Sequence, residues 1–288
     1  MVRESSTGKR VLVAAATGME ACLRGIARYG RPRGWHIMSD MAHTGVFPQG
    51  WEGDGIIAVA NHQENFISEI LAADAPCVEI AFSGEGMICP SIRGDNIAVG
   101  ELAADHLMRR AFRSYAWAPF IADSTNEALL AGFEARLADQ DLRCQMLPAA
   151  HGFSGGRRIG DRAAYRRELF TRLQQLPRPA AIFAANDCVA LEIAAACREL
   201  ELVLPDEIAV LGVGNDVALC ESFPIPLSSV VLDREEMAFR AAAALEGIMR
   251  GHSVPDLILV PPGQVVARAS TMDASAIPGS SSHGLIRS

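Results

Sequence analysis

Hydrophobic and polar positions follow two alternating patterns along most of the chain. Short apolar runs typical of buried strands occupy residues 10–16, 54–60, 76–82, 115–122, 180–187 and 208–214. Between them, apolar residues recur every three or four positions, which predicts helices near 20–29, 63–73, 98–110, 127–139, 163–175, 189–200 and 234–249. Strands that alternate with helices in this way predict βαβ units on parallel sheets, and therefore an α/β fold.

The remaining segments carry weaker patterns. Residues 257–270, "LILVPPGQVVARAS", are expected to form a short strand pair, and the Gly- and Arg-rich residues 151–161 a flexible surface loop. Residues 272–288 are rich in serine and glycine without periodicity, so we expect them to be disordered, as are the polar residues 1–8.

Length and composition narrow the class of protein. A chain of 288 residues with 50% hydrophobic content can bury a large core in about two domains. Its net charge of −8 argues against a nucleic-acid-binding face on these residues. No secretory signal and no membrane-spanning apolar run is visible, which predicts a cytoplasmic protein without a membrane partner. The seven cysteines include no C-x-x-C pair, so buried, reduced thiols are expected.

Polar pairs stand where three strands end and helices begin. In open α/β sheets, ligands bind beyond the carboxyl ends of the strands, and carboxylates and amides suit the hydroxyl groups of a sugar-like ligand. The candidate ligand-binding residues are Asp95, Asn96, Asn186, Asp187, Asn215 and Asp216, with Asn126, Glu127, Met19 and Glu20 as weaker candidates. Asn and Asp are also the preferred N-caps of helices, so capping remains an alternative role for each pair.

An enzyme is the less favoured interpretation. Residues 152–156 match the G-x-S-x-G pattern of serine hydrolases, with Ser154 as nucleophile and His252 or His283 downstream. That pattern requires a strand before the serine and a helix after it, whereas Pro148 precedes it and an Arg-rich polar segment follows. No histidine spacing suits a metal and no phosphate-binding loop occurs, so we expect no catalytic residue, metal or cofactor.

Several stretches resemble one family of bacterial regulators. They include "RGDNIAVGELAADHLMRRAFRSYAW", "LPDEIAVLGVGND", "PLSSV" and "LVPPGQVVARAST", and the similarity covers residues 9–271. The chain resembles the sugar-sensing domain of regulators of the xylose-operon type. In that group a LacI/GalR-like domain with the periplasmic-binding-protein fold is joined to a C-terminal, AraC-type helix-turn-helix domain.

The resemblance implies an architecture and a mechanism. It implies two Rossmann-like lobes, 9–113 plus 231–252 and 114–230 plus 253–271, with a small sugar-like effector in the cleft between them. Closure of the lobes would act on a homodimer that binds DNA through the helix-turn-helix domain. A stand-alone solute-binding protein is the alternative.

Three features depart from the pattern of the group. Gly214 stands where relatives usually carry aspartate, and Leu129 and Leu130 stand where they tend to carry arginine. Both changes remove polar groups from a site that would recognise hydroxyls, which argues against xylose itself as the effector. After Thr271 the sequence runs into the low-complexity tail instead of a helix-turn-helix domain.

Overall fold

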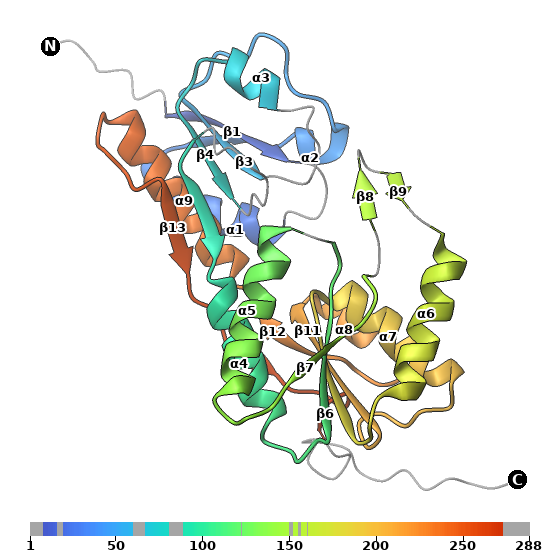
Figure 1. The fold of residues 1–288 in the computed structure, drawn as a ribbon. Coiled ribbons are helices and arrows are strands. Elements are labelled where there is room, and N and C mark those ends of the chain that lie inside the picture. The colour runs from blue at the N-terminus through green and yellow to red at the C-terminus, as the bar shows by residue number, and fades with distance from the viewer. Residues whose placement is uncertain are drawn as a thin grey trace, which may run out of the picture. The chain divides into compact units, whose positions relative to one another are not determined.

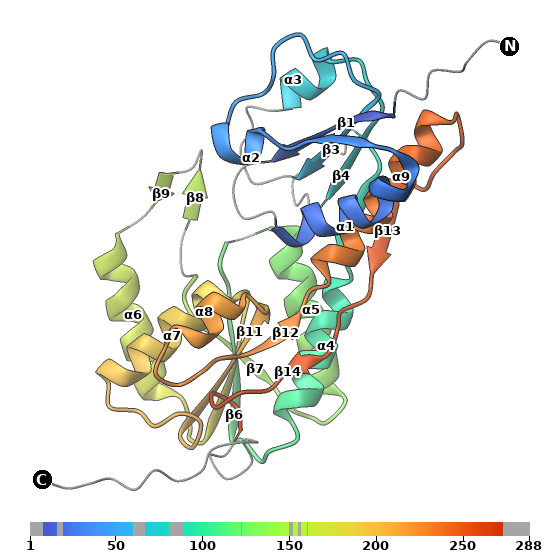
Figure 2. The same ribbon diagram turned by 180° about the vertical axis from the view of Figure 1, so that it is seen from behind.

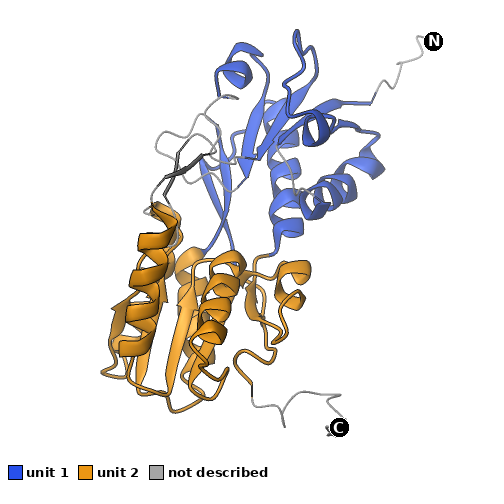
Figure 3. Cartoon of the chain, turned by 90° about the vertical axis from the view of Figure 1, so that its right-hand side faces the viewer, with its two compact units in different colours: residues 1–95, 154–157, 233–261 blue, residues 96–153, 158–232, 262–288 orange. Residues whose placement is uncertain are grey.

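The computed structural model describes residues 8–15, 20–59, 67–80, 89–121, 123–149, 152–154, 157–159 and 161–272. The chain divides into two compact units, coloured separately in Figure 3. Unit 1 contains residues 1–95, 154–157 and 233–261, and unit 2 contains residues 96–153, 158–232 and 262–288. Each unit is built on a six-stranded, mainly parallel sheet with helices on both faces, so the predicted two-lobed α/β fold is confirmed.

The sheet of unit 1 has the strand order β13-β5-β4-β3-β1-β2 (Figure 1). Its strands are β1 (Arg10–Ala15), β2 (His36–Met38), β3 (Gly55–Val59), β4 (Cys77–Ile80), β5 (Ser91–Gly94) and β13 (Leu257–Val260). Its helices are α1 (Glu20–Gly30), α2 (Met41–Thr44), α3 (Ile67–Ala72) and α9 (Arg234–Met249), with a 3-10 turn at Arg31–Arg33. One core cluster joins a sheet face to α1 and α9, which lie side by side in Figure 2, and a second joins the other face to α2 and α3.

The sheet of unit 2 has the order β14-β12-β11-β10-β6-β7. Its strands are β6 (Ser114–Ala118), β7 (Cys144–Met146), β10 (Ala180–Ala184), β11 (Ile208–Gly214), β12 (Ser228–Val231) and β14 (Val265–Val266). Its helices are α4 (Asn96–Leu107), α5 (Ser124–Ala138), α6 (Arg162–Gln175), α7 (Asp187–Glu199) and α8 (Val217–Glu221). Helices α4 and α5 pack on one face of the sheet, and α6 and α7 pack on the other.

Helices α4 and α5 approach each other closely through two glycines. A Cβ atom on Gly100 would lie 2.1 Å from the carbonyl oxygen of Leu129, and one on Gly132 would lie 2.0 Å from that of Ile97. Because neither position has room for a side chain, the backbones of the two helices are in direct contact. This packing ties α4 to unit 2.

The boundaries of the units differ from those implied by the resemblance. Residues 96–113 were expected in the first lobe, but α4 packs on α5, β10 and β12 of unit 2. Residues 253–261 were expected in the second lobe, but β13 pairs in parallel with β5 of unit 1.

Two local predictions were wrong. The segment 257–270 does not form a strand pair, because β13 joins the sheet of unit 1 whereas β14 pairs antiparallel with β12 in unit 2. The expected loop at 151–161 contains two short strands, β8 (Gly152–Ser154) and β9 (Arg157–Ile159), which pair with each other. The predicted disordered ends lie almost entirely outside the described residues.

A buried hydroxyl network holds the last described segment to unit 2. The Oγ of Ser270 donates to the carbonyl oxygen of Val210 in β11 and accepts from the backbone N–H of Ser228, at 2.6 and 2.8 Å. The Oγ1 of Thr271 lies 2.7 Å from the Oγ of Ser228 and 2.8 Å from Nε2 of His106 on α4. Burial, together with the positive charge of Arg109, lowers the pKa of His106 to about 4.

Candidate functional site

Three helices of unit 2 begin where strands of its sheet end. Asp123 caps α5, Asn186 caps α7 and Asp216 caps α8. In each case the side-chain oxygen accepts a hydrogen bond from a backbone N–H of the first turn, at 2.8, 2.9 and 3.2 Å respectively. Helix capping is therefore one role of Asn186 and of Asp216. The capping oxygen of Asn186 is Oδ1, and among the described residues its Nδ2 has no acceptor.

Asp187 has an internal structural role. Its side chain is 3% exposed, its Oδ1 accepts from the hydroxyl of Ser229 at 2.6 Å, and its Oδ2 accepts from the backbone N–H of Asp216 at 2.7 Å. Burial raises the pKa of Asp187, although these two hydrogen bonds favour the ionised form. Asp187 thus joins the start of α7 to β12 and to the end of β11.

Asn215 belongs to the same network. Its backbone N–H donates to Ser229 Oγ at 2.9 Å, and its Oδ1 accepts from Nη2 of Arg268 at 3.0 Å. Asn215 has φ +53° and Gly214 has φ +120°, so β11 ends with two residues in the left-handed half of backbone space. Because a side chain at φ +120° is strained, the backbone conformation itself favours glycine at position 214.

The other candidates of unit 2 lie apart from this network. Asn126 is 8% exposed, and its amide bridges the backbone N–H of Phe120 and the carboxylate of Asp123 at 3.1 and 2.7 Å. Glu127 is exposed on the first turn of α5. Leu129 is 2% exposed within the apolar core, so this position contributes packing.

The candidates near the first sheet are less closely connected. The backbone N–H of Asp95 donates to the carbonyl oxygen of Val260 at 2.8 Å, and Asn96 is the first residue of α4. Glu20 is exposed at the start of α1, and Met19 lies outside the described residues. Within the described ranges, no group of three or more His, Cys, Asp or Glu side chains could hold a metal ion.

Sequence reasoning missed a buried carboxyl group in unit 1. Glu79 on β4 is 3% exposed, and its Oε1 has no hydrogen-bond partner among the described residues. Nη2 of Arg93 on β5 lies 3.8 Å from that oxygen. Burial raises the pKa of Glu79, while the Ser91 hydroxyl and the charge of Arg93 oppose this shift. A glutamate inside the apolar run "PCVEIAF" was the signal that could have identified it.

Ser229 and Arg268 were also missed. Ser229 lies in the motif "PLSSV" and Arg268 in the motif "R.ST". Both motifs support the family resemblance, but no property of the sequence predicts which residues these two side chains contact. Arg268 donates to Asn215 and to the carbonyl oxygen of Leu227, and Ser229 bridges Asp187 and Asn215. These hydrogen bonds hold the ends of β11 and β12 in place.

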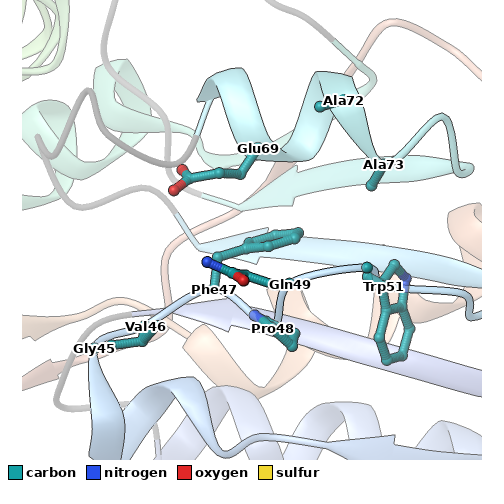
Figure 4. A pocket seen from close by; sticks show the side chains of 10 residues that line it. Gly45, Val46, Phe47, Pro48, Gln49, Trp51, Glu69, Ala72 and Ala73 are labelled. Carbon is teal, nitrogen blue, oxygen red and sulfur yellow. The ribbon is translucent and has the colours of Figure 1, made fainter.

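Unit 1 also contains a pocket of about 540 Å³ between α3 and the loop at residues 45–51 (Figure 4). Phe47, Trp51, Gln49 and Glu69 are among its lining residues. None of the nine candidate residues that the structure describes is among its lining residues.

The arrangement around Ser154 does not match a hydrolase elbow. Ser154 ends the short strand β8, and the next described residues form β9 rather than a helix. No helix described by the structure is long and apolar enough to cross a membrane.

Comparison with known proteins establishes the family. The model of a family described as "Periplasmic binding protein-like domain" matches residues 104–271, more than half of the chain. The chain belongs to this periplasmic-binding-protein-like family.

Solved structures share the fold. The "xylose-binding transcription activator xylR" aligns with 91% of this chain and 69% of its own, with a TM-score of 0.75 and 22% identity. The "transcriptional regulator CelR-cellobiose complex" aligns with 91% of this chain and 84% of its own, with a TM-score of 0.70 and 20% identity.

Among curated proteins, this periplasmic-binding-protein-like chain is similar to the xylose operon regulatory protein of Escherichia coli (strain K12). The two are 27% identical over 235 residues, which is 77% of this chain. The chain spans 57% of the length of that relative. These relatives are transcription regulators rather than enzymes.

Proposed function

We propose that this chain is the effector-binding domain of a transcription regulator and that its effector is a small sugar or sugar-like polyol. The observation that carries the proposal is unused hydrogen-bonding capacity at polar side chains on a fold shared with sugar-binding regulators. Relatives with this fold are a xylose-binding activator and a regulator in complex with cellobiose.

The unused groups suit hydroxyl ligands. Asn186 offers the donor Nδ2, and the buried Glu79 offers the acceptor Oε1. A sugar hydroxyl both donates and accepts, so it can satisfy each of them. Within its own unit, each of these groups is proposed as a contact for a hydroxyl of the effector. The exposed carboxylates of Asp216 and Glu127, together with Asp95, Asn96 and Glu20, are secondary candidates.

The effector is proposed to differ from xylose. Gly214 supplies no carboxylate at the end of β11, and its φ of +120° disfavours one. Both carboxylate oxygens of Asp187 already have internal partners, and the Oδ1 of Asn215 accepts from Arg268, which leaves Asn215 only its Nδ2 for a ligand. Asp187 would position the strand ends instead of contacting the sugar.

The wider assignments are proposals that rest on the family. They are a cytoplasmic homodimer, lobe closure as the signal, and DNA binding through an AraC-type helix-turn-helix domain as in the group that the sequence resembles. Light scattering with and without effector would test the dimer, and a monomer at micromolar concentration in both states would contradict it.

A thermal-shift screen against pentoses, hexoses and sugar acids tests the central proposal. A ligand at 100 times its Kd adds about 2.7 kcal/mol to the free energy of unfolding, so binding raises the unfolding temperature. Glycerol at the same concentration is the control, because polyols stabilise proteins without a specific site. We expect one class of sugar to exceed glycerol clearly. A screen in which no sugar does so would overturn the proposed effector class.

A further inference from the structure

Two cysteine side chains of unit 1 are in direct contact. Cys77 is the first residue of β4, and Cys89 lies two residues before β5. Their Sγ atoms are 3.0 Å apart, closer than two sulfur atoms in ordinary van der Waals contact. Both residues are half-buried and neither is in a disulfide.

Strand register brings these residues together. In the β4–β5 ladder, Glu79 pairs with Ser91 and Ile80 pairs with Ile92, a constant offset of 12 residues. Cys77 and Cys89 have the same separation of 12, so they stand opposite each other at the start of the ladder. Neighbouring strands are about 4.8 Å apart, and disulfides span Cα separations of roughly 4.4–6.8 Å. Bond formation shortens the sulfur separation to about 2.05 Å and leaves the ladder intact.

The other cysteines lack this combination of proximity and access. Cys22, Cys197 and Cys220 are buried, so only three of the seven cysteines match the buried thiols expected from the sequence. Cys144 is half-buried and Cys188 is exposed. Within the described part of the chain, neither has another sulfur in contact.

We propose that Cys77 and Cys89 form a redox-sensitive pair that a hydroperoxide converts into a disulfide between β4 and β5. The thiolate of one cysteine attacks hydrogen peroxide and becomes a sulfenic acid, and hydroxide leaves and is protonated to water. The second thiol then attacks the sulfenic sulfur, and the S–S bond forms as a second water leaves. Two thiols and one peroxide thus yield one disulfide and two waters. The proposal is independent of the proposed function.

The two sulfurs have different surroundings. The contact with Cys77 and burial both raise the pKa of Cys89, and the nearby Glu79 carboxylate adds to this shift. Either thiolate can react first with peroxide, and the other thiol then resolves the sulfenic acid. In Cys89→Ser, the sulfenic acid at Cys77 has no resolving thiol and is expected to react with dimedone.

Mass spectrometry of the native full chain tests the pair. After peroxide treatment, alkylation and proteolysis, the wild-type chain should lose two alkylation sites and about 2 Da, with residues 77 and 89 in one linked peptide. Dithiothreitol should restore both sites. Cys188→Ser, which removes the exposed thiol, is the matched control and should form the same link.

Thermal unfolding supplies a second readout. The bridge closes a short loop, so the oxidised chain should unfold at a temperature roughly 5–10 °C higher than the reduced chain. Cys77→Ser and Cys89→Ser should show no such rise. A cooperative unfolding transition in each variant shows that it folds. The proposal fails if peroxide leaves both thiols alkylatable in the folded wild-type chain, or if the linked peptide joins other cysteines.

Discussion

The two units have similar sheets but differ in the hydrogen-bond partners of their buried carboxyl groups. In unit 2, both oxygens of Asp187 accept hydrogen bonds from the protein itself. In unit 1, Oε1 of Glu79 has no hydrogen-bond partner among the described residues, and the charge of Arg93 lies 3.8 Å away. A buried acceptor without a partner destabilises the fold, and a ligand hydroxyl that donates to it would remove that cost. Asp187 therefore builds the strand ends of unit 2, whereas Glu79 keeps one carboxylate oxygen without a hydrogen-bond partner in the described part of the chain.

Asp187→Ala should give the largest effect. It leaves the Ser229 hydroxyl and the Asp216 N–H without an acceptor and opens a cavity, which should cost roughly 3–4 kcal/mol of unfolding free energy. Urea unfolding followed by Trp117 fluorescence reports on unit 2, in a background where Trp35 and Trp51 are replaced by phenylalanine. Asp216→Ala, which removes only an exposed cap, is the control and should cost about 1 kcal/mol. Equal losses for both variants would contradict the structural role of Asp187.

A pH series tests a second internal contact of unit 2. His106 has a folded pKa of about 4, below its unfolded value of about 6.5. The unfolded state therefore binds a proton first, and stability present at neutral pH is lost as pH falls from 6.5 towards 4. The loss attributable to His106 is roughly 2–3 kcal/mol. In urea unfolding at pH 7 and pH 4.5, His106→Gln should show a smaller difference than wild type; an unchanged difference would exclude His106 as its source.

Glu79→Gln separates binding from stability in unit 1. Folding raises the pKa of Glu79. Ionisation of this carboxyl group therefore lowers the free energy of unfolding as the pH rises above its pKa in the unfolded chain, which is about 4.3. At pH 7 the variant should unfold at an equal or higher urea concentration, because it carries no buried charge. Its affinity for the effector should fall about 10- to 100-fold, since a charge-assisted hydrogen bond is lost. Calorimetry that showed unchanged affinity would remove Glu79 from the site.

Asn186→Asp should give the smallest effect and tests the cap against the ligand role. Aspartate keeps the capping oxygen but has no donor when ionised. Stability should change by less than about 0.5 kcal/mol, while affinity for the effector should fall about 5- to 20-fold. Asn186→Ala is the paired variant, and it should lose both cap and affinity. If Asn186→Asp binds the effector as wild type does, Asn186 acts only as a cap.

Local patterns predicted much of the fold. Helix α9 begins and ends where its apolar periodicity predicted, at Arg234 and Met249, and α6 differs by one residue. Strand β12 was not predicted, because Ser228 and Ser229 interrupt its apolar pattern. Both serines are buried, since partners distant in the sequence satisfy their hydroxyls. Propensity and periodicity carry no information about such partners.

The site was less predictable for the same reason. The sequence placed Asn186, Asp187, Asn215 and Asp216 at strand ends, and the structure places them there. It could not distinguish a side chain that bonds to its own fold from one that keeps a free donor. Ser229 is 42 residues from Asp187, and Arg268 is 53 residues from Asn215. Only the folded chain shows which hydrogen bonds are already made.

The hydroxyl network of Ser228, Ser270 and Thr271 has a mechanical consequence. Its hydrogen bonds to β11, β12 and α4 hold the backbone at residues 270 and 271 rigidly within unit 2. Residues 268–271 are therefore an integral part of the core of unit 2, although they follow its last strand.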